Sequence, residues 1–151
     1  VLSASIYKLL FTKCYNRYMK KGFKDNIEQL TLKNINFRKV LYTAKHSQLV
    51  LMSLKPREEI GFEVHKDGDQ FFRFEVGKGK VIINETTYLV GDGDSIVVPA
   101  GAKHNVINTS ETEDLKLYTV YSPPHHKDGI VRKTKQDAID NEEEFDGKYT
   151  E

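Results

Sequence analysis

Short segments rich in β-branched and aromatic residues recur between residues 37 and 121, and a turn sequence ends each of them. These residue types suit a pleated, half-buried surface, while the intervening Asp-Gly, Gly-x-Gly and Pro-x-Gly sequences suit tight turns. The predicted strands cover residues 37–42, 47–54, 61–65, 70–76, 80–83, 86–90, 95–98, 104–108 and 115–121. Many short strands at this spacing predict an all-β sandwich or barrel.

Helix signals occur only on either side of this strand region. Residues 25–32 are predicted to form a short helix, and Thr134 can cap a second one because Asp137 follows three residues later. We therefore expect three parts: a basic leader over residues 1–21, a β-barrel over residues 22–122, and a C-terminal tail with a short helix over residues 123–151.

The leader contains basic side chains and no acidic one. This composition is typical of an organelle transit peptide, and it also suits a solvated addition to the domain. The single cysteine, Cys14, cannot form an intrachain disulfide, which fits a reducing compartment such as the cytoplasm. A formal net charge of +1 and the lack of a long apolar run predict neither a nucleic-acid partner nor a membrane span.

Alternation assigns the two faces of the strand over residues 70–76. Gln70, Phe72 and Phe74 share one face, whereas Phe71 and Arg73 share the other. A polar Gln70 at the head of an apolar inward face needs a polar partner. Phe71 on the outward face predicts that a further surface, such as another subunit, covers this sheet.

Four side chains in this region can donate to a metal ion. Glu63 and His65 stand two apart on a predicted strand and so share a face, Gln70 opens the next strand after a four-residue turn, and His104 opens a later one. Carboxylate oxygen, imidazole nitrogen and amide oxygen are all competent metal donors. Taken separately, they also suit a buried hydrogen-bond cluster and a core histidine.

Two spaced motifs join these residues. The first reads Glu63-x-His65-x4-Gln70-x6-Gly77, and the second reads Gly93-x5-Pro99-x-Gly101-x2-His104-x3-Asn108. Together they resemble the two signature motifs of the cupin superfamily, G-x5-H-x-H-x3,4-E-x6-G and G-x5-P-x-G-x2-H-x3-N. The resemblance implies a double-stranded β-helix, or jelly-roll, barrel. The central stretch is similar to small single-domain cupins labelled mannose-6-phosphate isomerase-like. Because homodimers are common among such cupins, the resemblance implies a homodimer.

The first motif departs from the family pattern at three positions. Arg57 stands in place of the opening glycine, Glu63 in place of the first histidine and Gln70 in place of the glutamate. The resemblance still implies one divalent metal ion (Fe, Mn, Ni, Co or Zn), bound by Glu63, His65, Gln70 and His104. The alternative is an inherited but degenerate site that binds no metal.

Such a centre predicts an enzyme acting on a small molecule, either a sugar-type isomerase or a dioxygenase. The alternative is a non-catalytic module that binds a small ligand or serves as an accessory subunit. No residue is assigned a catalytic role. Asp67, Asp69, Arg73 and Tyr118 are candidates to surround the metal or meet the substrate. The pair His125-His126 follows two prolines and is expected to form an exposed linker; the alternative is that it closes over the pocket.

Overall fold

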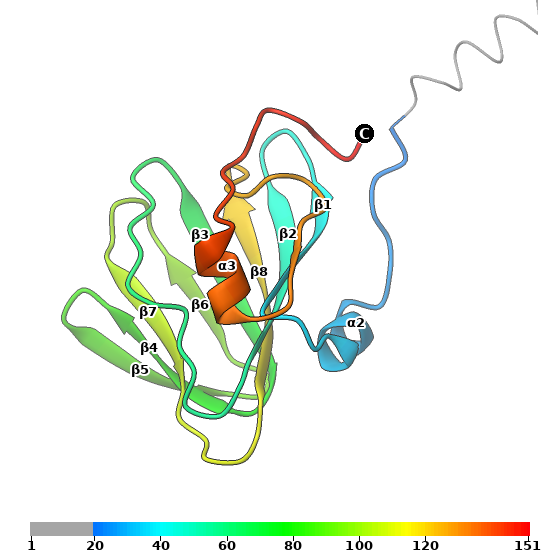
Figure 1. Cartoon of the computed structure of the whole chain (residues 1–151). Helices are drawn as coiled ribbons and strands as arrows, with labels where there is room; N and C mark the ends of the chain where they lie inside the picture. Colours follow the sequence, from blue (N-terminus) through cyan, green and yellow to red (C-terminus); the bar gives the residue numbers. More distant parts are fainter. Residues whose placement is uncertain (1–19) are drawn as a thin grey trace, which may run out of the picture.

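The computed structural model describes residues 20–151. The predicted basic leader, apart from its last two residues, therefore lies outside the described residues. Two antiparallel sheets face each other across a shared core (Figure 1). The larger sheet contains, in spatial order, β6 (Ser95–Val98), β3 (Asp69–Val76), β8 (Leu115–Ser122), β2 (Gln48–Leu54), β1 (Arg38–Thr43) and β9 (Val131–Arg132). The smaller sheet contains β5 (Thr86–Gly91), β4 (Lys78–Ile83) and β7 (His104–Asn108). The prediction of an all-β jelly-roll fold is confirmed.

The predicted strand over residues 61–65 was wrong. This segment runs beside β7 but makes only two isolated bridges, Glu59 with Ile107 and Glu63 with His104. The segment advances four residues from Glu59 to Glu63, while β7 advances three from His104 to Ile107. The segment therefore carries one extra residue, as in a β-bulge. Gly61 lies inside the bulge at φ +108°, a conformation that favours glycine.

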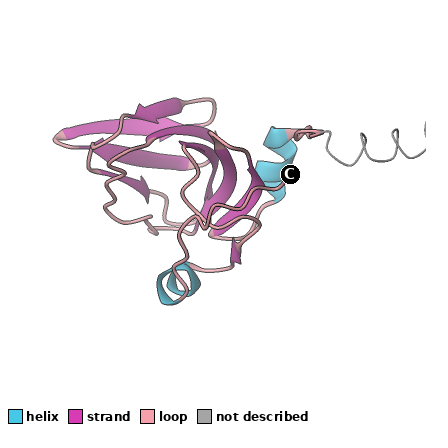
Figure 2. Cartoon of the chain, turned by 90° about the horizontal axis from the view of Figure 1, so that it is seen from above, coloured by secondary structure: helices cyan, strands magenta, loops and turns pink. Residues whose placement is uncertain are grey.

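The two helices lie on different sides of the barrel (Figure 2). Helix α2 (Ile27–Lys33) starts after Asn26, whose side chain accepts from the Gln29 N–H. It packs against the outer face of β2, β3 and β8. Helix α3 (Lys135–Asp140) starts after Thr134, whose hydroxyl accepts from the Asp137 N–H as predicted. Within residues 20–151, no helix has the length and apolar character needed to cross a membrane.

The segment after residue 122 is part of the same fold. It contains the predicted helix, and it also adds β9 to the edge of β1. Near its end, the Thr150 N–H donates to the Thr43 carbonyl, and the Glu151 carboxylate accepts from the backbone N–H groups of Lys21 and Gly22. Both ends of the described chain are therefore attached to the same side of the barrel.

The barrel interior is layered along the strands. At one end, β2, β8 and β3 align the polar side chains of Gln48, Tyr121 and Gln70, all almost fully buried. Toward the other end, the same strands contribute only apolar inward side chains. These are Met52, Leu54, Phe74, Leu115 and Leu117. The apolar end supplies the hydrophobic stabilisation, and the polar end contains buried polar side chains that can take part in binding or catalysis.

Phe71 and Phe72, adjacent residues of β3, test which face of the larger sheet points into the core. Phe72 is fully buried in the core, whereas Phe71 lies on the outer face and is only partly covered. Phe72→Ala should lower the free energy of unfolding by about 3–5 kcal/mol, because it removes a ring from a closed interior. Phe71→Ala should cost about 1 kcal/mol or less. Urea denaturation measures both values, and equal losses would contradict the assignment.

Candidate metal centre

Glu63 and His104 occupy directly opposed positions in an antiparallel bridge. The Glu63 N–H donates to the His104 carbonyl at 2.9 Å, and the His104 N–H donates to the Glu63 carbonyl at 3.0 Å. Directly opposed residues send their side chains to the same face. The bridge therefore brings the carboxylate and the imidazole together, although they lie 41 residues apart in the chain.

The turn before β7 holds the third donor. Gly101 adopts φ +82°, and its N–H donates to the His65 carbonyl at 2.8 Å. The Ala102 N–H closes the turn on the Pro99 carbonyl. A residue with a β-carbon is strained at such a φ value, so a glycine suits this position of the second motif. The motif residues thus fix the backbone on both sides of the site.

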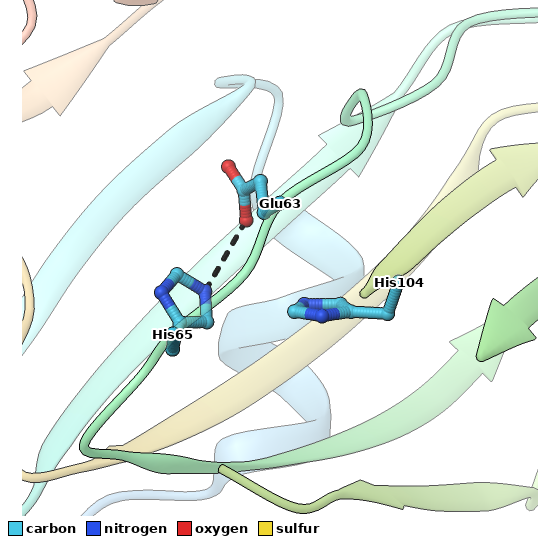
Figure 3. Close-up of side chains that lie close together, drawn as sticks. All are labelled: Glu63, His65 and His104. Carbon is cyan, nitrogen blue, oxygen red and sulfur yellow. Dashed lines mark ion pairs between the residues drawn. The ribbon is translucent and has the colours of Figure 1, made fainter. Parts of the chain in front are cut away.

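The side chains of Glu63, His65 and His104 converge (Figure 3). Each can offer one ligand atom such that the three atoms lie within 4.8 Å of one another. The Glu63 Oε2 and His65 Nε2 atoms are 3.4 Å apart. Gln70 joins the cluster, because its Oε1 lies 3.0 Å from His104 Nε2. The structure thus brings together all four predicted metal donors.

The surroundings of His104 favour a cation at its Nε2 atom. Its Nδ1 lies 3.1 Å from the Ala102 carbonyl, while its Nε2 faces Gln70 Oε1. The Gln70 amide nitrogen donates to the Thr119 hydroxyl, which turns the amide oxygen toward His104. A neutral imidazole has only one N–H, so it satisfies one of the two oxygens. Burial lowers the pKa of His104 against the opposing effects of Ala102 and Glu63, so the neutral ring offers a hydrogen to one of these oxygens and leaves a lone pair on its other nitrogen.

The Glu63 carboxyl is ionised in this environment. Burial by itself would raise its pKa, but His65, Arg38 and His104 together hold the pKa below its usual value. The Arg38 guanidinium approaches from the side away from His65, with Nη2 at 3.9 Å from Glu63 Oε1. A negative charge is therefore present between two imidazole rings.

The donor set fits a divalent metal ion. His65 Nε2 is buried and makes no well-aligned hydrogen bond, although Glu63 Oε2 lies 3.4 Å away, so a cation between the two atoms would satisfy both. Two neighbouring ligands placed roughly 2.1 Å from one ion lie about 3.0–3.4 Å apart. The distances from Glu63 to His65 and from Gln70 to His104 fall in this range.

A pocket of about 210 Å³ opens beside His65. Its wall includes Lys66, Asp67, Asp69, Tyr121 and His125. Asp67 is exposed at the rim, whereas Asp69 accepts a hydrogen bond from the Ala100 N–H. Both predicted aspartates thus border the pocket, outside the donor cluster.

Arg73 and Tyr118 lie elsewhere. They pair in register on β3 and β8 and face the outside of the larger sheet. The Arg73 Nε is 3.7 Å from the Glu75 carboxylate, and the Tyr118 ring lies near Phe71. Because alternate residues of a strand face opposite sides, the structure places Arg73 on the side of the sheet away from Gln70.

The exposed linker expected at His125-His126 was wrong. The His125 ring centroid is 4.3 Å from that of His65, and the ring stacks on Tyr121. His126 is 5% exposed, and its backbone exchanges hydrogen bonds with the Gln48 side chain. Burial lowers the pKa of both histidines and raises that of Tyr121, so this wall of the site is uncharged.

Sequence reasoning assigned no role to Arg38. Its side chain points inward from β1 and is 10% exposed. One signal was available, because Arg38 alternates with Val40 and therefore shares a face with a core residue. For the two histidines, the signal was their position directly after the stiff pair Pro123-Pro124.

Comparisons with known proteins agree with the fold and the motifs. The family described as Cupin domain matches residues 50–121. The uncharacterized protein YrkC of Bacillus subtilis is 48% identical over 128 residues, which cover 81% of this chain and 68% of that protein. The uncharacterized protein L612 of Acanthamoeba polyphaga mimivirus is 48% identical over 109 residues, 70% of this chain and 68% of that one. The crystal structure of BH2720 from Bacillus halodurans matches with a TM-score of 0.78 and 40% identity over 82% of this chain and 98% of its own. The chain belongs to the cupin family.

Proposed function

We propose that this protein binds one divalent metal ion through Glu63, His65 and His104, with Gln70 as a fourth donor, and acts on a small molecule in the adjacent pocket. The observation that carries the proposal is the convergence of three ligand atoms within 4.8 Å of one another, with His65 also lining that pocket. Two imidazoles and one carboxylate suit Fe, Mn, Ni, Co or Zn.

Each donor is prepared for this role by its neighbours. Glu63 supplies a negative charge that the nearby Arg38 and histidines stabilise. His104 is oriented by the Ala102 carbonyl, which leaves its Nε2 directed into the cluster. Thr119 holds the Gln70 amide so that its oxygen points the same way. Such support keeps the ligand atoms in place and reduces the cost of ordering them on binding.

The pocket suits a compact polar molecule. Its volume of about 210 Å³ is smaller than that of a site for a drug-sized ligand, typically about 300–1,000 Å³. His125 and Tyr121 cover one side of His65 and exclude water there, while Asp67 and Lys66 at the rim can hydrogen-bond to a substrate. A bound divalent ion would supply Lewis-acid polarisation of a substrate oxygen or, for a redox-active metal, oxygen chemistry.

Two reaction classes use such a centre. A sugar-type isomerase needs a proton-moving group beside the substrate and no oxygen, whereas a dioxygenase needs a redox metal and consumes oxygen. The metal identity and oxygen uptake separate the two. The non-catalytic alternative, a binding or accessory module, requires that ligand affinity does not depend on Glu63.

Glu63→Ala should lose the metal. The variant removes the only carboxylate of the donor cluster, whereas Glu59→Ala provides a matched control in the same segment. The Glu59 carboxylate accepts from the Asn105 side chain on the outer side of β7. Mass-spectrometric metal analysis of protein purified without added metal should give near-stoichiometric metal in the unchanged protein and in Glu59→Ala. Metal retained in Glu63→Ala would refute the ligand assignment. Absence of metal even after reloading would favour the non-catalytic module.

Gln70→Ala should weaken metal affinity by about 10- to 100-fold, the usual cost of losing a weak ligand or an orienting partner. Thr119→Val should weaken it less, because it removes only the hydroxyl that orients the amide. Competition with a chromophoric chelator measures the affinities, and thermal unfolding checks that both variants fold. Unchanged affinity in Gln70→Ala would limit the metal ligands to Glu63, His65 and His104.

The homodimer remains a prediction. Val97 of β6 is 64% exposed and pairs in register with Phe71, so apolar side chains lie together on the outer face of the larger sheet. Burial of such a patch favours association. Sedimentation equilibrium should report a dimer for the unchanged protein and a weaker one for Val97→Asp. A monomeric unchanged protein would contradict the prediction.

A further inference from the structure

We propose that Arg38 binds the carboxylate of a small anionic substrate next to the metal centre. This inference rests on the metal centre proposed above and narrows its substrate class. It places the substrate's carboxylate in a second pocket on the Arg38 side of Glu63, rather than in the pocket beside His65. The residue lies on the inward face of β1, and its guanidinium is directed at Glu63.

The hydrogen-bonding state of Arg38 is the first observation. Its side chain is nine-tenths buried, and its Nε has no hydrogen-bond partner. Its Nη2 reaches Glu63 Oε1 only to 3.9 Å, which is beyond hydrogen-bond distance. A guanidinium carries five N–H donors, and leaving a buried charged group without acceptors is costly. The described chain provides no acceptor at Arg38 Nε. Because Arg73 Nε on the outer face also lacks one, the pocket beside Arg38 is the feature that distinguishes it.

The charge balance is the second observation. Without metal, the Glu63 carboxylate offsets the positive charge of Arg38. Once Glu63 serves as a ligand to a divalent ion, the same carboxylate faces three positive charges and offsets one of them. The histidines and Gln70 add no negative charge. An anion entering beside Arg38 offsets a second of these charges in a region of low dielectric.

A second pocket provides the space. It has a volume of about 120 Å³, lies under α3, and is lined by both Arg38 and Glu63. Phe37 and Ile60 form apolar walls, and Lys135 of α3 adds a second positive group. Glu142 lies at its exposed rim, where solvent screens its charge. The volume corresponds to about four water molecules, which fits a molecule of a few heavy atoms.

The chemistry of Arg38 favours a carboxylate. A planar guanidinium matches the two oxygens of a carboxylate in a bidentate arrangement, and a partially buried pair of this kind is stronger than a surface pair. The substrate class we infer is thus a small carboxylic acid whose other oxygen reaches the metal centre. Arg73, the arginine that the sequence offered as a substrate candidate, lies beside Glu75 on the outer face and serves as a matched control.

The experiment uses the full chain loaded with Co²⁺, whose visible spectrum reports changes at the metal. Glycolate is the probe, and glycolamide is its neutral counterpart with the same number of heavy atoms. Calorimetric titration should show binding of glycolate and little binding of glycolamide. Arg38→Gln should weaken glycolate binding by about 30-fold or more while cobalt content stays stoichiometric. The glycolate affinity of Arg38→Lys should lie between those of the unchanged protein and Arg38→Gln, because lysine keeps the charge and lacks the planar pair of donors. Arg73→Gln should bind glycolate like the unchanged protein.

The outcomes separate this inference from the proposed metal site. If the unchanged protein takes up no cobalt, the metal site and the Arg38 inference both fail. If it takes up cobalt but binds glycolate no better than glycolamide, only the Arg38 inference fails. Equal glycolate affinity in Arg38→Gln and the unchanged protein, or equal weakening in Arg73→Gln, also overturns it. Should Arg38→Gln unfold, Arg38→Lys alone decides, since unchanged affinity there contradicts bidentate binding. Tighter Arg38-dependent binding of inorganic phosphate than of glycolate would overturn the carboxylate assignment.

Discussion

The backbone bridge between Glu63 and His104 is the contact on which the site depends. Two reciprocal hydrogen bonds place a carboxylate and an imidazole on one face of the barrel interior. The bridge needs the extra residue around Gly61, because without this bulge the exposed Phe62 would face His104. It also needs the turn at Gly101, which pins the His65 carbonyl. The three donors thus owe their proximity to main-chain geometry.

The two ends of the barrel interior have different roles, one in stabilising the fold and the other in forming the candidate site. The apolar end holds the core together, while the polar end contains a connected network around Gln48, Tyr121 and His126. Buried polar groups that satisfy one another rigidify their surroundings. Against this background, the unpartnered atoms of His65 and Arg38 are exceptions. They lie on either side of Glu63, which is where a cation and an anion would complete the network.

Strand alternation and turn chemistry predicted most of the fold, because short amphipathic strands with glycine-rich turns have few packing solutions. The donor set was predicted from the resemblance of the two spaced motifs to the cupin signatures, and the structure brings its four side chains together. The segment over residues 61–65 was the failure. Its residue types suit a strand, but its pairing is interrupted by a bulge, and pairing is a property of both partners.

The sequence by itself determined the fold class, the ends of most strands and the four candidate donors, because each of these follows from local periodicity or from a spaced motif. Only the tertiary structure decided which other groups surround the donors. Arg38, His125 and Tyr121 come from β1, the segment after β8 and β8 itself, and they meet Glu63 and His65 only when the sheets close. Strand alternation had already assigned Arg73 to the outer face with Phe71, whereas the register that pairs Tyr118 with Arg73 comes from the tertiary structure. Long-range pairing sets such neighbours, and no local pattern encodes it.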